Sequence, residues 1–407
     1  MIRPYFDLFY QEKRILSFGM LMTFFSSFGQ TFFISLFAGS WKEEFGIGSG
    51  LYGTIYSAAT LCSAAVLPFA GRWIDSADLR RFSVGVLLVM ALGCLGLGFA
   101  SQPWHLLPLF FMLRLSGQGL CGHVANTTMA RKFEGRRGKA LGISALGFPL
   151  GEGLFPFAMV SLVALMGWRW TCWLNAGTVV LVTIPLAAWL LAPPELREPP
   201  SLQPGQGGLA PGEKEWTRGH VLKDLRFYIL LPNYLLIPFA VTGLIFHQGI
   251  LVECEGWTME VLAKAFVGFA ATRILFSLFV GSLVDKFGAR KLFPFVSVSI
   301  CLGIVLVLWG GIPYLPWVYM SLMGGSMGFA SSVGGAMWAE IYGTRHLGAI
   351  KSLAASMGIF GTALSPALFG WALEAGIHFH GIMVSTVVAA ILAAVLCLPA
   401  SYGSAGR

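Results

Sequence analysis

The sequence predicts an all-α polytopic membrane protein with 12 transmembrane helices in two pseudo-symmetric six-helix bundles. Hydrophobic residues make up 56% of the 407 residues and charged residues 11%, with a mean hydropathy of +0.74, which is too apolar for a soluble protein. Apolar runs of roughly 20 residues recur, each long enough to cross about 30 Å of hydrocarbon. A charged eleven-residue stretch also occurs twice, which indicates duplication.

The apolar runs predict the helices in order along the chain. We expect them at about 15–38, 51–74, 82–100, 104–130, 140–165, 170–192, 226–250, 260–283, 291–310, 316–340, 348–373 and 381–400. The one long break, 193–224, is rich in Pro and Gly and mixed with charges, so it predicts a linker. The domains are therefore expected at 1–192 and 225–407, with a cytoplasmic linker at 193–224.

The repeated stretch begins at Gly71 and again at Gly281, 210 positions later. Gly, Asp and a basic pair fall at the same offsets in both copies, as Gly71, Asp75, Arg80 and Arg81, then Gly281, Asp285, Arg290 and Lys291. Each copy follows one apolar run and precedes another, so it is expected to form a tight cytoplasmic loop. The glycine allows close helix approach, and the basic pair favours the anionic cytoplasmic face of the membrane.

The distribution of charge predicts the orientation. The net charge is +8, and 22 of the 27 Lys and Arg residues fall in segments that alternate onto one side. This asymmetry predicts a multi-pass plasma-membrane protein, in a bacterial inner membrane, with both termini cytoplasmic. It also argues against a nucleic-acid partner, because the basic residues follow the loops instead of forming one patch.

The sequence lacks the motifs of other chemistries. Seven Cys, mostly within spans, fit no disulfide framework or metal-ligand spacing, and there is no phosphate-binding loop or H-E-x-x-H. We therefore expect no cofactor, no metal and no enzyme activity. A receptor or a membrane-embedded enzyme would need an output domain or a nucleophile–base pair, and neither is evident.

The loop pattern G-x-x-x-D-x-x-x-x-R/K-R/K resembles the loop 2–3 and loop 8–9 motif of the major facilitator superfamily of secondary transporters. The first copy departs from the family at Ser76 and Asp78. The resemblance implies two bundles that rock about a central site. It also implies that the loop residues Gly71, Asp75, Arg80, Gly281, Asp285 and Arg290 form a conformational latch.

Two residues deep in the first bundle are candidates for proton coupling, because ionisable groups within spans are costly. Arg114, in Arg114-Leu-Ser-Gly-Gln118-Gly, resembles the helix 4 motif of the superfamily, and Glu152 lies in a Gly/Pro-rich run like that of its helix 5. A lone carboxylate there could bind a proton reversibly, whereas a static Arg114–Glu152 or Gln118–Glu152 pair would only hold helices 4 and 5 together. Direct contact with substrate is a third alternative.

Arg273 in the eighth span is the candidate for substrate recognition. It precedes Asp285 by twelve residues, which places it about 18 Å along the helix from the loop and near the midplane. A guanidinium facing a central cavity would offer paired donors to a carboxylate. The monocarboxylate and oxalate–formate branches also use a helix 8 Arg, about one turn nearer the Asp. The alternative is a structural Arg bonded to helix-end carbonyls.

Further polar residues are expected around a small cavity, although each could instead join two helices. They are Ser27, Gln30, Tyr56, Gln118, His123, Asn126, Ser331 and Ser332. His247 could titrate as a coupling residue or act as a neutral gate beside Gln248. The stretch from Trp338 to Pro366 resembles the loop 10–11 and helix 11 region of the same branches. Its charged residues Glu340, Arg345 and Lys351 are expected to form a charge latch between helices, with ligand contact as the alternative.

These observations predict a secondary active transporter that moves a small organic anion, a monocarboxylate in the leading hypothesis, by alternating access with a proton or another coupling ion. We expect a monomer in the lipid bilayer. The alternatives are a proton-driven exporter of drugs or metabolites, favoured by 33 Phe and 15 Met, and a nitrate-like carrier of an inorganic anion.

Overall fold

The structure is a computed structural model, and it describes residues 3–75, 77–133, 136–196, 216–312, 314–343 and 346–402. The chain divides into two compact units, the N half (Met1–Gln203) and the C half (Pro204–Arg407). All regular secondary structure in the described ranges is helical, which confirms the predicted all-α fold. Residues 197–215 of the predicted linker lie outside the described residues, so the linker boundaries remain a prediction.

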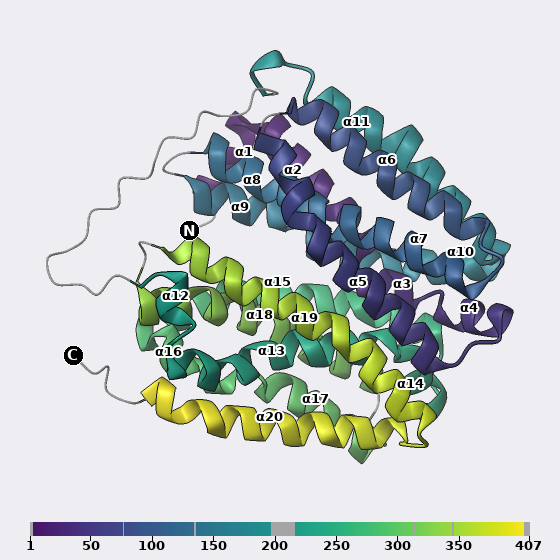
Figure 1. Ribbon diagram of the computed structural model, residues 1–407, viewed down its shortest axis with the longest axis vertical. Helices are drawn as coiled ribbons and strands as arrows, with labels where there is room; N and C mark the ends of the chain where they lie inside the picture. Colours follow the sequence, from purple (N-terminus) through teal and green to yellow (C-terminus); the bar gives the residue numbers. More distant parts are fainter. Residues whose placement is uncertain are drawn as a thin grey trace, which may run out of the picture. The chain divides into compact units, whose positions relative to one another are not determined.

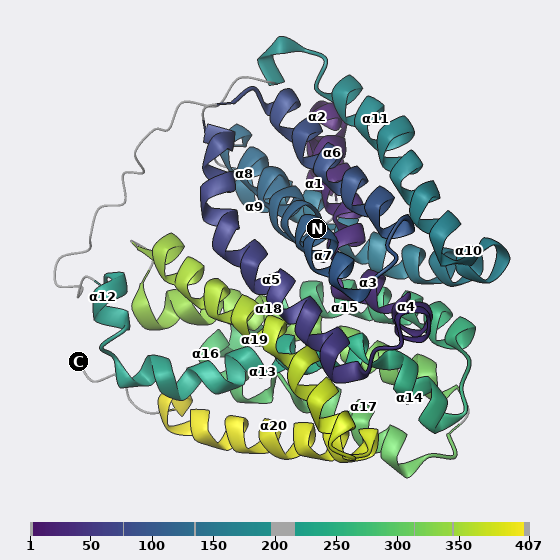
Figure 2. The same ribbon diagram turned by 45° about the vertical axis from the view of Figure 1, so that its right-hand side comes forward.

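In the N half, several spans are built from shorter helical pieces, whereas α5 and α6 are long single helices (Figures 1 and 2). The elements are α1 (Arg3–Gln11), α2 (Lys13–Phe25), η1 (Ser26–Gly29), α3 (Thr31–Ser35), α4 (Ala38–Phe45), α5 (Ser49–Gly71), η2 (Arg72–Asp75), α6 (Leu79–Gly98), η3 (Pro103–His105), α7 (Leu106–Leu113), η4 (Arg114–Cys121), α8 (Gly122–Lys132), α9 (Arg137–Ala145), α10 (Gly147–Thr178), η5 (Val179–Thr183), α11 (Ile184–Leu190) and η6 (Pro194–Leu196). Gly167, with φ 79° and ψ 165°, divides α10 into the end of helix 5 and the start of helix 6.

The C half contains longer unbroken helices (Figure 1). Its elements are α12 (Arg218–Val221), α13 (Leu225–Phe246), α14 (Gln248–Glu255), α15 (Met259–Phe287), α16 (Ala289–Leu292), η7 (Phe293–Phe295), α17 (Val298–Trp309), α18 (Leu315–Tyr342), α19 (Leu347–Glu374) and α20 (Phe379–Tyr402). Within this half, α15 packs along α18 and α13 packs along α19 and α20.

Nine helices of the described residues are long and apolar enough to cross a membrane, by length and composition. One of them, Arg137–Leu190, contains two spans because it turns back at Gly167. The two remaining predicted spans are the less apolar helices at 106–132 and 315–342. Large apolar side chains such as Leu165 (80% exposed) and Leu278 (70% exposed) lie on the outside of their halves, as a bilayer requires.

The two halves share one register, 210 residues apart. The first and last residues of α4 and α14 differ by 210, as do the starts of α5 and α15, the ends of α8 and α18, and the starts of α9 and α19. Gly46 and Gly256 end α4 and α14 in the left-handed conformation, with φ 61° and φ 65°. The offset found in the repeated loop therefore extends through most of each half, as expected for a duplicated six-helix unit.

Candidate functional site

Helix 1 is broken in its middle. The α-helix α2 gives way to the 3₁₀ turn η1, and Gln30 is extended (φ −83°, ψ 154°) before α3 begins. Irregular backbone at membrane depth leaves polar groups that protein or a water-lined cavity must satisfy. Broken helices in transporters commonly mark ligand sites for this reason. The break therefore places backbone polar groups inside the N half, and the neighbouring helices must satisfy them.

Helix 4 packs against this break through backbone. A Cβ atom added to Gly29 would lie 2.1 Å from the carbonyl oxygen of Leu113 and 2.7 Å from the amide nitrogen of Gln118. Gly117 approaches Gly29 equally closely, since its own Cβ would lie 2.6 Å from the amide nitrogen of Gly29. Only glycine on both helices permits this contact, and helix 4 adopts a π-helical turn, η4, along it.

Arg114 satisfies the backbone that the break exposes. Its side chain is 1% exposed, and Nη1 donates to the carbonyl oxygen of Gly29 at 2.9 Å. Its Nε donates to the Thr60 hydroxyl on α5 at 3.1 Å, and its guanidinium lies 5.0 Å from the centre of the Tyr56 ring. Tyr56 in turn shares a 2.7 Å hydrogen bond with Thr31. One side chain therefore ties helices 1, 2 and 4 together.

Glu152 lies beside a second close contact with helix 1. A Cβ atom on Gly151 would lie 2.1 Å from the Ser27 hydroxyl, so helix 5 touches the break directly. Glu152 itself is half-buried. Among the described residues, the hydrogen bonds of Arg114 go to Thr60 and Gly29, so the static Arg114–Glu152 pair considered from the sequence is not formed.

In the C half, Arg273 is the central residue of α15, with 14 residues of the 29-residue helix on either side, and it is half-buried. The backbone of α15 at Arg273 packs closely against a row of small residues on α18, which we call the α15–α18 seam. A Cβ atom on Gly328 would lie 2.4 Å from the carbonyl oxygen of Arg273, and one on Gly324 would lie 2.1 Å from that of Phe269. Close backbone packing of this kind leaves little freedom for either helix to slide.

Hydroxyl groups complete the seam between α15 and α18. Thr272 donates to the carbonyl oxygen of Ser321 at 2.7 Å, and Ser332 donates to that of Ser277 at 3.1 Å. Ser331, one of the predicted cavity residues, donates to the carbonyl oxygen of Gly328 in its own helix at 2.9 Å. Glycine, short hydroxyl side chains and backbone therefore form the tightest part of the α15–α18 contact, with Phe276 packed beside Gly325.

His247 lies at the junction of α13 and α14, where its φ of −100° and ψ of 19° interrupt helix 7. It is 4% exposed, and its Nε2 lies 2.9 Å from the carbonyl oxygen of Pro366 in α19. A carbonyl can only accept, so this nitrogen carries the hydrogen. The contact joins the bend of helix 7 to the proline of helix 11.

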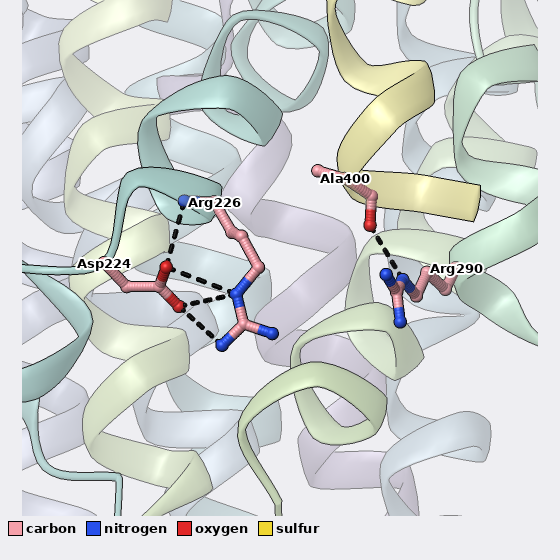
Figure 3. Close-up of polar contacts among 4 residues, drawn as sticks. All are labelled: Asp224, Arg226, Arg290 and Ala400. Carbon is pink, nitrogen blue, oxygen red and sulfur yellow. Dashed lines mark hydrogen bonds and ion pairs between the residues drawn. The ribbon is translucent and has the colours of Figure 1, made fainter. Parts of the chain in front are cut away.

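The loop 8–9 motif is anchored by a carboxylate from helix 10. Both oxygens of Glu340 accept from the start of α16, from the amides of Ala289 at 2.6 Å and Arg290 at 2.9 Å. The Arg290 Nε donates to the carbonyl oxygen of Ala400 at 2.8 Å (Figure 3). In the N half, Asp78 performs the same capping from within its own helix, accepting from the Arg81 amide at 2.8 Å.

A second charged contact lies at the start of α13 (Figure 3). Asp224 accepts from the amide of Arg226 at 3.0 Å and pairs with its guanidinium at 2.9 Å. Burial raises the pKa of Asp224, but the hydrogen bonds from Arg226 outweigh this, so the pKa lies below its ordinary value. The Arg226 guanidinium also lies 5.3 Å from the centre of the Trp216 ring.

The other predicted residues are dispersed. Gln30 and Gln118 are half-buried, whereas Asn126, Asp285 and Lys351 are exposed. Gly71 packs on His123, and the His123 Nε2 lies 3.2 Å from the Gly71 carbonyl oxygen. The side chain of Asp75 and all of Arg345 lie outside the described residues. In the described ranges, no group of three His, Cys, Asp or Glu residues could hold a metal ion.

The sequence did not lead us to Thr60, Thr31 or the break in helix 1. The available signal was the cluster Ser26-Ser27-Phe28-Gly29-Gln30 within an otherwise apolar span, since small and polar residues favour non-helical backbone at such a place. The pairing of Thr60 with Arg114, which are 54 residues apart, leaves no local signal.

The fold and these motifs agree with comparisons to known proteins. The family model of the Major Facilitator Superfamily matches residues 19–270 and 255–407. The chain belongs to this superfamily, and it is therefore a membrane transporter and not an enzyme.

Two curated relatives indicate a branch of the superfamily. The oxalate:formate antiporter of Oxalobacter formigenes is 23% identical over 83% of this chain and 81% of its own length. The human monocarboxylate transporter 14 is 29% identical over 43% of this chain and 32% of its own.

Two solved structures share the fold. The nucleoside transporter NupG has a TM-score of 0.75 at 14% identity, covering 96% of this chain and 99% of its own. A bacterial homologue of the human lysosomal transporter Spinster, inward-facing and unoccupied, has a TM-score of 0.73 at 16% identity, covering 96% of this chain and 97% of its own.

Proposed function

We propose that the protein is a secondary active transporter that carries a small organic anion, a monocarboxylate or a small dicarboxylate, by alternating access. The observation that carries this proposal is the similarity to an oxalate:formate antiporter along most of both chains. The shorter similarity to a monocarboxylate transporter points to the same substrate class. Both relatives are named for carboxylates, which are planar anions with two acceptor oxygens.

Arg273 is the residue we assign to substrate recognition. It lies at the centre of α15, so it lies near the middle of the membrane if that helix spans it. A guanidinium stays charged at every physiological pH and presents paired N–H donors that match a carboxylate. The neighbouring α15–α18 seam would hold the Arg273 backbone still while the side chain engages the anion, and such rigidity favours specific recognition.

The test is anion exchange by the purified protein in proteoliposomes. Vesicles loaded with unlabelled formate or oxalate should take up labelled oxalate, formate or lactate. In R273A, exchange should fall by about a hundredfold, because losing one partner of a desolvated charge pair costs about 3 kcal/mol. R273K should keep part of the activity, since lysine supplies the charge without the fork.

The matched control is K264A, on the same helix but exposed and paired with Glu260 at 2.6 Å, which should exchange at the wild-type rate. Gel filtration should show that all variants stay monodisperse. Wild-type exchange of every anion by R273A would overturn the role of Arg273. A wild-type protein that carries none of these carboxylates would overturn the substrate class, and nitrate and a lipophilic cation in the same assay would then test the alternatives.

We also propose that a proton is the coupling ion and that Glu152 is the leading group to carry it, with Arg114 and His247 as the other candidates. Glu152 is a half-buried carboxylate next to the broken part of helix 1, where a change of charge would act on a helix already interrupted. E152Q should remove the pH dependence of anion flux while exchange of bound anion continues. An unchanged pH profile would exclude Glu152.

We infer from the charge asymmetry that the repeated loops and both termini face the cytoplasm of a plasma membrane, and that the monomer is the working unit. In this orientation the loop motifs would latch one state of the cycle. D285N should then slow exchange more than it weakens substrate affinity. A pure loss of affinity, measured from the concentration dependence of uptake, would argue against the latch.

A further inference from the structure

Each half of the protein ends its first span with a short helix that is separated from the rest of the span by an interruption. In the N half, α4 follows Phe37 (φ −93°, ψ −3°), and in the C half α14 follows His247 (φ −100°, ψ 19°), 210 positions later. Both helices have eight residues and both end on a left-handed glycine. A helix attached through an interruption of one or two residues can pivot there unless other contacts hold its far end.

In both halves, an acidic residue at the far end of the short helix pairs with a basic residue near the start of the sixth span. In α4, Glu44 pairs with Arg169 at 2.8 Å, and Arg169 also donates to the carbonyl oxygen of Ala100 at 3.1 Å. In α14, Glu255 pairs with the Nε2 of His380 at 2.5 Å. We call these contacts the N brace and the C brace.

The two braces differ in how they respond to pH. The N brace contains an arginine, which does not lose its proton, and it is reinforced by tryptophans. The Arg169 guanidinium lies 4.2 Å from the centre of the Trp168 ring, and Trp168 packs edge-on against the fully buried Trp41 of α4. In α14, Leu251 stands where α4 has Trp41, and the brace contains histidine.

We propose that the Glu255–His380 pair is a proton-responsive site that fixes α14 when His380 is protonated and releases it to pivot at His247 when the pH rises. Histidine is the side chain whose charge changes in the physiological range, and an ion pair with Glu255 exists only while the imidazole carries its proton. As the pH rises, the pair loses its ionic component and keeps at most a neutral hydrogen bond. The N brace keeps its ion pair across the same range.

Other titratable and charged groups lie on α14 and on the adjoining ends of elements that it contacts. They are Glu253 and Cys254 of α14, Glu260 and Lys264 of α15, His247 between α13 and α14, and His378 two residues before His380. Lys264 is paired with Glu260 at 2.6 Å. His247 donates to the carbonyl oxygen of Pro366, whereas His380 pairs with a carboxylate of α14, so the H380R variant separates the two histidines.

The inference does not depend on which substrate is carried, and its test needs no transport. Hydrogen–deuterium exchange would be measured on the full-length purified protein at pH 5.5 and pH 8.0, corrected for the intrinsic pH dependence of amide exchange. In the wild type, residues 248–255 should exchange roughly two- to fivefold faster at the higher pH, the range expected for a partly exposed pair. Residues 38–45 of α4, measured in the same sample, should change by less.

Reciprocal variants make the test specific. H380R gives the C half a permanent cation and should abolish the pH dependence of α14, whereas R169H should introduce one in α4. H380Q should leave α14 exchanging fast at both pH values, which separates loss of the pair from misfolding when gel filtration is unchanged. Equal exchange of α14 at both pH values in the wild type, or the same pH dependence in H380R, would overturn the proposal.

Discussion

The N half and the C half place a mid-helix arginine in different positions of the same framework. Arg114 lies on helix 4 of the N half, and the equivalent residue of the C half, 210 positions later, is Gly324. Arg273 lies on helix 8 of the C half, and its equivalent in the N half is Ser63. The two halves therefore share their helix boundaries, but each half has its mid-helix arginine at a position where the other half has an uncharged residue.

The consequence is a difference in what holds the second and fourth spans of each half together. In the N half, the Arg114 side chain bridges α5 and the break in helix 1. In the C half, α15 and α18 touch through close glycine contacts and through hydroxyl-to-carbonyl hydrogen bonds. We infer that Arg114 maintains the fold of the N half, whereas the role we propose for Arg273 is substrate recognition.

The largest expected loss of stability comes from a substitution in the α15–α18 seam, at Gly324. In G324A, the new Cβ would lie 2.1 Å from the carbonyl oxygen of Phe269. To remove this clash the two helix backbones must move apart, which loses packing between them. We expect a loss of about 3 kcal/mol of stability, measured as a lower midpoint of thermal unfolding. The control is G335A in the same helix, because a Cβ there meets no atom within 4 Å. Equal melting temperatures for the two variants would contradict the seam.

The next effect concerns the helix 2 partner of Arg114. T60V removes the hydroxyl that accepts from the Arg114 Nε and leaves a buried donor unsatisfied, which should cost about 1–3 kcal/mol. S63A is the matched control, because the Ser63 hydroxyl only donates to the carbonyl oxygen of Thr60 in its own helix, at 2.8 Å. A T60V protein as stable as S63A would show that Arg114 does not tie helix 2 to helix 1.

The smallest effect distinguishes the two braces by pH. The hydrogen bond from Arg169 lowers the pKa of Glu44 and outweighs the opposing effect of burial, so this pair stabilises the fold above the pKa of an unfolded glutamate, about 4.3. Its contribution, below about 1 kcal/mol for such an exposed pair, should disappear as the pH falls through the lowered value. E44Q should therefore be slightly less stable than the wild type at pH 7 and equal to it in strong acid. A difference that persists in acid would contradict the pairing.

Periodicity and composition were sufficient to predict the helices and the duplication. All 12 predicted spans are helical, and the 210-residue offset of the loop motif recurs at the ends of α8 and α18. These features depend on local hydrophobicity and on turn residues, which a sequence displays directly.

The details of the candidate site depend on contacts between distant segments. The break in helix 1 is stabilised by Arg114, 85 residues beyond Gly29, and the cap of α16 comes from Glu340, about 50 residues beyond it. The sequence identified Arg114 and Glu340 as notable charges. It could not assign their partners, because a hydrogen bond to a backbone carbonyl or amide places no requirement on the residue type that provides it.

The most direct test of a structural role for Arg114 and a substrate-binding role for Arg273 is the thermal unfolding of R114M and R273M. Both variants would be measured with and without a carboxylate that the wild type carries. We predict that R114M unfolds several degrees below the wild type and is still stabilised by the anion. R273M should lose the stabilisation by the anion, whatever its own unfolding temperature. An R273M protein that the anion still stabilises, or an R114M protein that it does not, would contradict the account.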